Sequence, residues 1–292
     1  TGDVLDYVKV AQQTEKECVI NRLAIPETIA TGVLTLKLYK LLDNSVVSST
    51  SMNINVVNPN IIMAMDTNPE VLTILMNHGL AKGEYLLKSD AEAITDSDIY
   101  VDGTHSIFTG SEITHFEEFQ YFTGLTTIPA FCFSGCGKLK EIVLPENIKS
   151  IKLNAFQNTA LTSIYIPALV NNIDLRAFSY SKQLTNIEVD NFNTTYCSAN
   201  GCIYVGARPY VLYTVAPGLT EYIMPEETIS VYGDGDVSWS IGSLLRRITL
   251  NANVRGVTGR WFMYGFSDLT EVTGTERPDI KYHNGCVYNS DY

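Results

Sequence analysis

Four of the six cysteines stand at spacings from which a zinc site could be built. Three residues separate Cys132 from Cys136, and four separate Cys197 from Cys202, so four thiolates are available as tetrahedral ligands. Aromatic residues interleave with these cysteines, however, and a thiol in an apolar setting usually packs as a small hydrophobic residue. We therefore interpret Cys132 and Cys136 as core residues and expect no zinc ion. Cys197 and Cys202 flank the turn-like Asn200-Gly201, so a disulfide across a hairpin is their alternative.

Other catalytic constellations are missing from the sequence. The histidines show neither an i, i+4 pair nor a neighbouring carboxylate pattern: they are His78, His105, His115 and His283. Gly135-Cys-Gly137-Lys138 resembles the end of a phosphate-binding loop, but Leu139 replaces the required hydroxyl residue. Asp234-Gly-Asp236 fits a solvated turn better than a cation site. We predict no cofactor, no metal and no enzyme activity; a hydrolase with an unrecognised carboxylate pair is an alternative.

Two helices are predicted ahead of the second half of the chain. Asn68-Pro69-Glu70 supplies an N-cap, a first-turn proline and a favourable charge, and Gly79 ends this helix. Ser89 and Glu92 have the spacing of a capping box for the second helix. With Gly83 at the turn, a calcium-binding hand would use ligand positions that lack a carboxylate, namely His78, Leu80, Lys82 and Ser89. We expect no calcium there, and expect the helices to cap the unit that follows.

An internal repeat of 22 to 23 residues organises the second half of the chain. One copy contains Leu139, Ile142, Leu144-Pro145, Ile148, Ile151 and Ala155-Phe156, and each landmark returns 22 residues later as Leu161, Ile164, Ile166-Pro167, Val170, Ile173 and Ala177-Phe178. Further copies begin at Leu184, Leu219, Leu245 and Leu269. A partial copy is predicted before them, in Leu125-Thr-Thr-Ile128-Pro129 followed by Phe133.

Each copy predicts one short strand with an apolar face. In Leu-x-x-Ile-x-Leu, alternate apolar residues point to one side, and a single strand cannot bury that side alone. Stacking the copies in parallel packs each Leu and Ile on its counterparts, while the Ala-Phe element closes the opposite wall. Pro145, Pro167 and Pro225 then end the strands, because proline has no N–H for a ladder.

At these residues the sequence resembles the BspA-like leucine-rich-repeat family of surface proteins. Phe133-Ser-Gly-Cys136-Gly-Lys-Leu139 is similar to the family's junction between repeats. The segment from Ser198 to Tyr204 is similar to a hairpin inserted between such repeats, and Asn284-Gly-Cys-Val-Tyr288 begins a second one. The lead-in from Ile107 to Thr123 is similar to that of Bacteroides-type members. The resemblance implies export, display at the cell surface, and adhesion or recognition without catalytic residues.

The predicted fold is α+β and mostly β, a leucine-rich-repeat solenoid of parallel stacked short strands. Residues 1–60 alternate apolar and polar residues, as in Val33–Tyr39, and predict a small β-sandwich-like or immunoglobulin-like module that acts as a spacer or a second binding module. Residues 61–122 form the helical cap and lead-in. Residues 123–292 form the repeats, with the hairpin insertion near 192–218.

The binding surface is predicted on the outer face of the stacked strands, between the inward Leu and Ile positions. One outward column contains Glu141, Ser163, Asn186, Glu221 and Arg247, and a second contains Val143, Tyr165, Glu188, Ile223 and Thr249. The second column mixes apolar, aromatic and acidic residues, which suits protein recognition. Plain solvent-facing strand positions are the alternative. Trp239, Trp261 and Tyr264 are a separate candidate for stacking on sugars, although core filling is the ordinary role of the two tryptophans.

The charge of the chain limits its partners. Twenty Lys and Arg against 32 Asp and Glu give a formal net charge of -12, which repels phosphate backbones and anionic lipid. No apolar stretch approaches the ~18 residues that span a bilayer. Because the sequence starts at Thr1, we expect that an N-terminal piece was removed, which is compatible with export. We predict a secreted or outer-surface bacterial scaffold whose ligand is a protein or a glycan, host-derived ligands included; a glycan-capturing accessory of polysaccharide uptake is the alternative.

Overall fold

A computed structural model of the chain describes residues 60–81, 83–102, 105–209, 211–231, 243–254 and 268–274, together with the backbone of six further strands. The chain divides into two compact units, Thr1–Ile62 and Met63–Tyr292. The first unit contains two antiparallel pairs, β1 (Val10–Gln13) with β2 (Cys18–Ile20) and β3 (Thr31–Tyr39) with β4 (Val46–Asn55). The strand predicted at Val33–Tyr39 lies in β3. The sandwich-like module stays a prediction.

Strand β5 (Ile61–Ala64) spans the boundary between the units. The second unit continues with α1 (Pro69–Asn77), β6 (Tyr85–Leu87) and α2 (Lys88–Ala93), followed by the pair β7 (Tyr100–Asp102) and β8 (His105–Ser106). Helix α1 begins at Pro69, as the sequence predicts. It ends in a Schellman arrangement, because Gly79 has φ +72° and the Leu80 N–H donates to the Leu75 carbonyl at 2.8 Å. The side chains of Val71, Leu72 and Leu75 form its buried face.

The capping box predicted for the second helix is wrong. Helix α2 begins at Lys88, one residue before Ser89, and its N-cap residue Leu87 makes no side-chain cap hydrogen bond. Ser89 therefore lies inside the first turn. Strand β6 ends at Leu87, directly before the helix, so the strand fixes the helix start in place of a serine cap.

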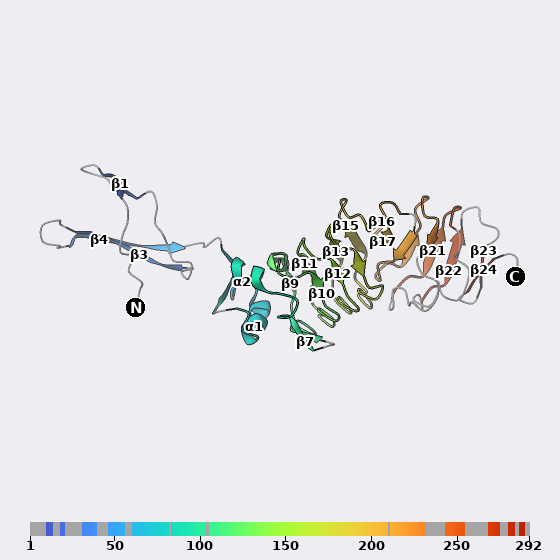
Figure 1. The fold of residues 1–292 in the computed structure, drawn as a ribbon, viewed down its shortest axis with the longest axis horizontal. Coiled ribbons are helices and arrows are strands. Elements are labelled where there is room, and N and C mark those ends of the chain that lie inside the picture. Colours follow the sequence, from blue (N-terminus) through green and yellow to red (C-terminus); the bar gives the residue numbers. More distant parts are fainter. Residues whose placement is uncertain are drawn as a thin grey trace. The chain divides into compact units, whose positions relative to one another are not determined.

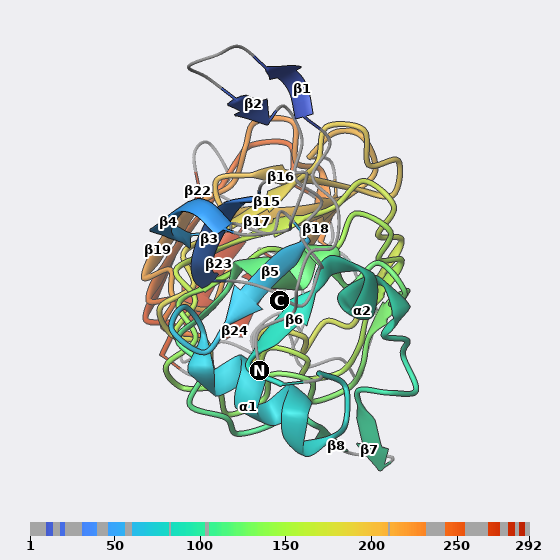
Figure 2. The ribbon, with the colours of Figure 1, turned by 90° about the vertical axis from the view of Figure 1, so that its left-hand side faces the viewer.

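The cap is tied to the first coils of the repeat by side-chain amide and carboxylate groups. The Asn68 amide donates to the His115 carbonyl at 3.1 Å and to a Glu118 carboxylate oxygen at 3.3 Å. Asp96 accepts from the backbone N–H groups of Thr126 and Thr127 at 2.9 and 3.2 Å. Figure 2 shows α1 and α2 at the end of the second unit that faces the viewer, with the coils behind them. This placement agrees with the predicted capping role.

Parallel strands stack into two ladders along the second unit (Figure 1). The first ladder carries the Leu-x-x-Ile strands and consists of β9 (His115–Phe116) with β11 (Glu141–Ile142), β13 (Ser163–Ile166) with β15 (Asn186–Val189), and β19 (Glu221–Ile223), β21 (Arg247–Leu250) and β22 (Glu271–Gly274). The second ladder consists of β10 (Thr127–Ile128), β12 (Ser150–Ile151) and β14 (Asn172–Ile173), and later of β18 (Val211–Thr214) with β20 (Ser230–Val231). The predicted solenoid of parallel strands is confirmed.

The predicted register of the first coil is wrong. Ile128 does not occupy the position of Ile142 but pairs with Ile151, which pairs with Ile173. The residue at the Ile142 position is Phe116. The 3₁₀-helix η1 (Glu117–Tyr121) lies between the two ladder positions of this coil and adds residues that break the 22-residue spacing.

A column of phenylalanines closes the wall opposite the first ladder. Phe108, Phe133, Phe156 and Phe178 stack with centroid distances of 5.4, 5.5 and 5.7 Å and interplanar angles of 11 to 16°. Backbone bonds join the same turns, for example from the Phe133 N–H to the Ala155 carbonyl at 2.7 Å and from the Phe156 N–H to the Ala177 carbonyl at 2.8 Å. The predicted role of the Ala-Phe element is therefore confirmed. Offset-stacked aromatic pairs contribute about 0.5–1.5 kcal/mol each beyond their burial.

Buried asparagines fasten the turns of neighbouring coils. The Asn193 amide donates to the carbonyls of Pro167 and Val170 at 3.1 and 2.8 Å, and its oxygen accepts from the N–H groups of Thr195 and Tyr196 at 2.9 and 2.8 Å. Asn251 repeats the arrangement, donating to Thr228 and accepting from Asn253 and Val254. Each such side chain satisfies backbone groups that the turn leaves without ladder partners.

The predicted hairpin insertion is present as β16 (Tyr196–Ala199) and β17 (Cys202–Val205), which pair antiparallel around Asn200-Gly201 and continue into β18. Cys197 pairs with Tyr204 and Cys202 with Ala199, so the two cysteines are not opposite each other, and both are free. The predicted second hairpin is β23 (Ile280–His283) with β24 (Cys286–Asn289), one strand on each side of residues 284–285.

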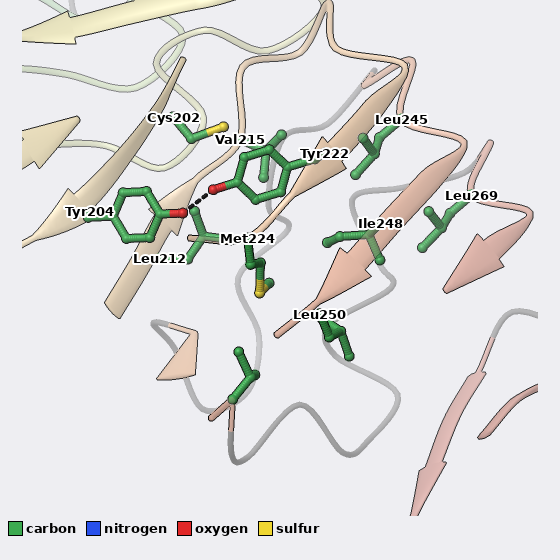
Figure 3. Close-up of a cluster of buried hydrophobic side chains, with 11 residues drawn as sticks. Cys202, Tyr204, Leu212, Val215, Tyr222, Met224, Leu245, Ile248, Leu250 and Leu269 are labelled. Atoms are coloured by element: carbon green, nitrogen blue, oxygen red, sulfur yellow. Dashed lines mark hydrogen bonds between the residues drawn. The ribbon is translucent and has the colours of Figure 1, made fainter. Parts of the chain in front are cut away.

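The hairpin also contributes to the core. Figure 3 shows the hydroxyl groups of Tyr204, from β17, and Tyr222, from β19, hydrogen-bonded to each other inside a cluster of buried apolar side chains. Tyr222 stands at the position that Ile164 and Ile248 hold in other coils. Burial raises the pKa of both tyrosines, so both are neutral phenols that need hydrogen-bond partners.

Candidate functional site

The strands of the first ladder present alternate residues outward. In β13 the residues Ser163 and Tyr165 are exposed, whereas Ile164 and Ile166 are buried, and β15, β19 and β21 follow the same alternation. The period of two residues therefore separates an apolar inner face from an accessible outer face. We call the latter the outer sheet face, meaning the outward positions of β11, β13, β15, β19 and β21 and the residue after β11.

All ten residues predicted to line the binding surface lie on the outer sheet face. Eight are exposed, and Asn186 and Thr249 are half-buried. Direct strand pairing places Ser163 beside Asn186, Tyr165 beside Glu188, and Ile223 beside Thr249. The apolar and aromatic members of the second column are Val143, Tyr165 and Ile223, with exposed fractions of 42, 45 and 66%. Their role in binding stays a prediction.

The turn of the inserted hairpin lies between the two groups of strands. The Ile187 N–H of β15 donates to the Gly201 carbonyl at 3.1 Å, and the Asn200 amide donates to the Ile223 carbonyl of β19 at 3.0 Å. Gly201 has φ +76°, and a Cβ there would lie 2.4 Å from the Thr185 carbonyl oxygen. The turn thus bridges the ladder and divides the outer sheet face into a first half, on β11, β13 and β15, and a second half, on β19 and β21.

In the second half, one arginine pairs with two carboxylates. Arg247 donates from Nη1 to Glu221 at 3.0 Å and from Nε to Glu271 of β22 at 2.7 Å. These contacts raise the pKa of the Arg247 guanidinium, chiefly through the Glu271 hydrogen bond. The Thr249 and Thr273 hydroxyl groups are 3.0 Å apart. Exposed ion pairs contribute only about 0–1 kcal/mol to stability, so these side-chain contacts chiefly order the surface of the second half.

The first half is acidic and aromatic. The Tyr165 hydroxyl donates to Asp190, and this hydrogen bond raises the pKa of Tyr165 to about 12 and lowers the pKa of Asp190. The Asn186 amide donates to Glu188 at 2.8 Å. The nearby charges of Asp190, Glu146 and Glu188 also raise the pKa of Tyr165, so three carboxylates surround its ring.

Two exposed apolar side chains beside the first half were missed by the sequence interpretation. Leu169, in the turn after β13, is 54% exposed, and Phe192, in the turn after β15, is 86% exposed. The Phe192 N–H donates to Asp190 at 2.7 Å, which fixes the turn that carries the ring. Asp190-Asn-Phe-Asn193 contains extra residues relative to the Leu250-Asn251 turn, and this insertion is the sequence signal that could have identified Phe192.

A groove of about 570 Å³ lies near the cap, along the second ladder. It is lined by Asp96, Ser97, Tyr100, Thr127, Pro129, Ala130, Lys152, Leu153 and Asp174. Asp96 accepts three hydrogen bonds from Thr126 and Thr127, and Asp174 accepts from the Arg176 N–H at 2.8 Å. Both carboxylates therefore hold backbone in place, which does not favour the paired acid and nucleophile of a hydrolase.

Cys132, Cys136 and Lys138 have structural surroundings. Cys132 and Cys136 are buried in the core as predicted, and burial raises the pKa of both thiols. No group of three His, Cys, Asp or Glu side chains that could hold a metal ion occurs among the described residues. Lys138 of the phosphate-loop-like segment pairs with Glu112 at 2.6 Å. Trp239, Trp261, Tyr264 and the Asp234-Gly-Asp236 turn lie outside the described residues.

Stacked Leu-x-x-Ile strands with an outer sheet face define a leucine-rich-repeat solenoid. Residues 105–202 match the BspA type leucine rich repeat region, in six copies. This segment therefore carries repeats of the BspA type. No curated protein is significantly similar to the chain. No helix of the described residues combines the length and the apolar character needed to cross a membrane.

Several solved structures are also similar to the chain. A leucine rich cell surface protein from Faecalibacterium prausnitzii is 19% identical, with a TM-score of 0.28, over 53% of this chain and 59% of that one. The pneumococcal vaccine antigen PcpA is 20% identical, with a TM-score of 0.40, over 51% and 37%. A leucine-rich repeat protein from Eubacterium ventriosum is 16% identical, with a TM-score of 0.37, over 56% and 54%. The chain thus spans roughly a third to three-fifths of the lengths of these proteins.

Proposed function

We propose that the chain is a non-enzymatic recognition scaffold that binds a protein partner through the outer sheet face. The observation that carries the proposal is the second outward column, in which Val143, Tyr165 and Ile223 expose apolar area at solvent-facing strand positions. Single exposed apolar residues are common on protein surfaces, but a column of them with polar neighbours is the composition of a protein interface. The BspA-type repeat supports the proposal, because leucine-rich repeats typically bind proteins through such a face.

The location at the cell surface is part of the same proposal. Proteins with repeats that resemble these are usually exported and displayed, so the partner would be met outside the bacterial cell, on a host or on another bacterium. Adhesion is the specific activity that we propose. The surface location is tested by antibody accessibility on intact cells, where labelling of the outer sheet face is the expected result and labelling only after lysis contradicts it.

The test of the binding function is a panel of purified extracellular matrix proteins and host glycans, with the immobilised chain as bait. We expect saturable binding to a protein of the panel. A double variant, Tyr165→Ala with Ile223→Ala, tests where the protein binds. It removes two apolar side chains of the outer sheet face, and neither substitution touches the core. Binding to glycans alone, or to no protein of the panel, contradicts the proposal.

A second candidate function, glycan capture, is favoured by the groove beside the cap. Its volume of about 570 Å³ lies in the range of ligand sites, and Tyr100 and Lys152 supply an aromatic ring and a charged donor along its lining. A glycan array would test it. Retention of a sugar by the intact chain, lost in Tyr100→Ala and kept in Tyr165→Ala, would support this function over protein recognition.

A further inference from the structure

The first half of the outer sheet face carries uncompensated negative charge. The carboxylates on this half are Glu141 and Glu188, and those in the turns beside it are Glu146 and Asp190. None of the four has a Lys or Arg within ion-pair distance in the part of the chain that the structure describes. Glu188 and Asp190 accept hydrogen bonds, but from the neutral side chains of Asn186 and Tyr165. The second half differs, because Arg247 there binds both Glu221 and Glu271.

The same half and the turns beside it present the exposed apolar side chains of Tyr165, Leu169 and Phe192. Asp190 connects two of them, since one of its oxygens accepts from the Tyr165 hydroxyl and the other from the Phe192 N–H. Buried Asn193 then joins the Phe192 turn to the preceding turn, through the carbonyls of Pro167 and Val170 on either side of Leu169. Leu169 and Phe192 are therefore held on adjacent, hydrogen-bonded turns.

A turn held in place before binding loses little backbone freedom when a partner covers it, so an aromatic anchor on a preordered turn gives more affinity than one on a mobile loop. Phe192 is 86% exposed, so nearly all of its apolar area is available for burial. The carboxylates on this half and in its turns favour approach by a positively charged partner and disfavour an acidic one. Charge and apolar exposure thus select the same kind of partner.

We infer that the first half of the outer sheet face docks a cationic polypeptide segment that carries apolar side chains, with Phe192 and Leu169 as anchors and Glu188 and Asp190 facing the Lys or Arg residues. This inference rests on the proposed protein-binding function and names the half of the face and the chemistry of the partner. The second half of the face contributes little, because its charges are already paired.

The test uses the full chain and a fluorescently labelled short peptide in which Lys alternates with Leu, titrated by anisotropy. Two comparison peptides replace Leu by Ser, or Lys by Glu. We expect the Lys–Leu peptide to bind more tightly than the Lys–Ser peptide, and the Glu–Leu peptide not to bind. We expect Phe192→Ala to weaken the Lys–Leu complex at least about tenfold, and Glu188→Gln to weaken it a few-fold and to reduce its salt dependence.

Matched controls separate this patch from general charge attraction. Ile223→Ala removes an exposed apolar side chain of the same column in the second half, and Glu226→Gln removes one exposed negative charge outside the patch. Both are expected to leave the affinity unchanged. Equal binding of the Lys–Leu and Lys–Ser peptides would overturn the inference. It would also be overturned if Ile223→Ala lowered the affinity for the Lys–Leu peptide as much as Phe192→Ala does. Because Phe192 is so exposed, its replacement leaves the fold intact.

Failure of this inference is distinguishable from failure of the proposed function. If binding of a protein partner is lost in Ile223→Ala and kept in Phe192→Ala, recognition through the outer sheet face is supported and the inference is wrong. If a protein partner binds, and neither these two variants nor any other change on this face affects its binding, then both the inference and the proposed function are wrong.

Discussion

At the scale of single residues, the chain departs from its repeat where a local requirement replaces the repeating residue. Tyr222 occupies an isoleucine position because the inserted hairpin delivers Tyr204 opposite it, and the two hydroxyl groups satisfy each other inside an apolar cluster. Tyr180 has φ +61° at a turn position that Asn158, with φ +54°, holds in the preceding coil. Asparagine tolerates the left-handed conformation, whereas tyrosine is strained in it.

The tyrosine pair gives a double-mutant prediction. Tyr222→Phe removes the tyrosine partner of the buried Tyr204 hydroxyl, and we expect this to lower the free energy of unfolding by about 1–3 kcal/mol. Tyr204→Phe should act similarly. The double variant should lose less than the sum of the two single variants, because neither remaining ring needs a partner. Urea unfolding of the four proteins measures this, and strictly additive losses would show that the hydroxyl groups do not interact.

The strained turn predicts a stabilising substitution. Tyr180→Asn should raise the free energy of unfolding by about 1 kcal/mol, because it relieves the left-handed backbone at a position whose side chain is exposed. The reciprocal Asn158→Tyr is the control and should destabilise by a similar amount. Thermal unfolding compares the midpoints, and a lower midpoint for Tyr180→Asn would refute the assignment of strain.

At the scale of elements, the inserted hairpin depends on the glycine at its tip. Gly201 and Gly206 both have positive φ, but only at Gly201 would a Cβ meet backbone, 2.4 Å from the Thr185 carbonyl oxygen. Around Gly206 nothing lies within 4 Å of that position. The first glycine therefore serves close approach to β15 as well as the turn, and the second serves only the turn.

This difference predicts two unequal losses. Gly206→Ala should cost about 1–2 kcal/mol, the strain of a side chain in the left-handed region. Gly201→Ala should cost clearly more, about 3 kcal/mol or above, since the hairpin must also move away from β15. Chemical denaturation of both variants gives the comparison. Equal losses would mean that the tip does not press against the strand.

The elements that follow the repeat period could be predicted from the sequence, and those that interrupt it could not. Alternation in Ser163–Ile166 and Asn186–Val189 predicts both the strands and their exposed positions, because strand geometry has a fixed period. The 3₁₀-helix at Glu117–Tyr121 has no periodic signal, so the register of the first coil was misassigned. The exposure of Phe192 could not be predicted for the same reason, since this residue lies in a turn and not in a strand.

At the scale of the whole molecule, the second unit is held together coil by coil. Phe133 and Phe156 each stack on the phenylalanines of the coils before and after them, and β12 pairs with both β10 and β14. In such an array, stability is approximately a sum of neighbouring interfaces, so damage to one coil spreads to its neighbours first.

Phe156 lies in the middle of the phenylalanine stack and tests this organisation. Phe156→Ala should lower stability by about 3–5 kcal/mol through the cavity that it leaves. Hydrogen exchange should lose protection first in β10, β12, β13 and β14, while β19, β21 and β22 keep theirs. Uniform loss of protection across the second unit would contradict the coil-by-coil account.

The most direct test of protein recognition through the outer sheet face compares two surfaces of the solenoid against one protein partner. One double variant, Tyr165→Ala with Phe192→Ala, alters the outer sheet face and the turn beside it. The other, Lys149→Ala with Asn172→Ala, alters exposed positions on the second ladder, directly before β12 and in β14. Isothermal titration of each double variant should give a Kd at least about tenfold weaker than wild type for the first and an unchanged Kd for the second. The reverse pattern would place binding on the other side of the coil and contradict the account.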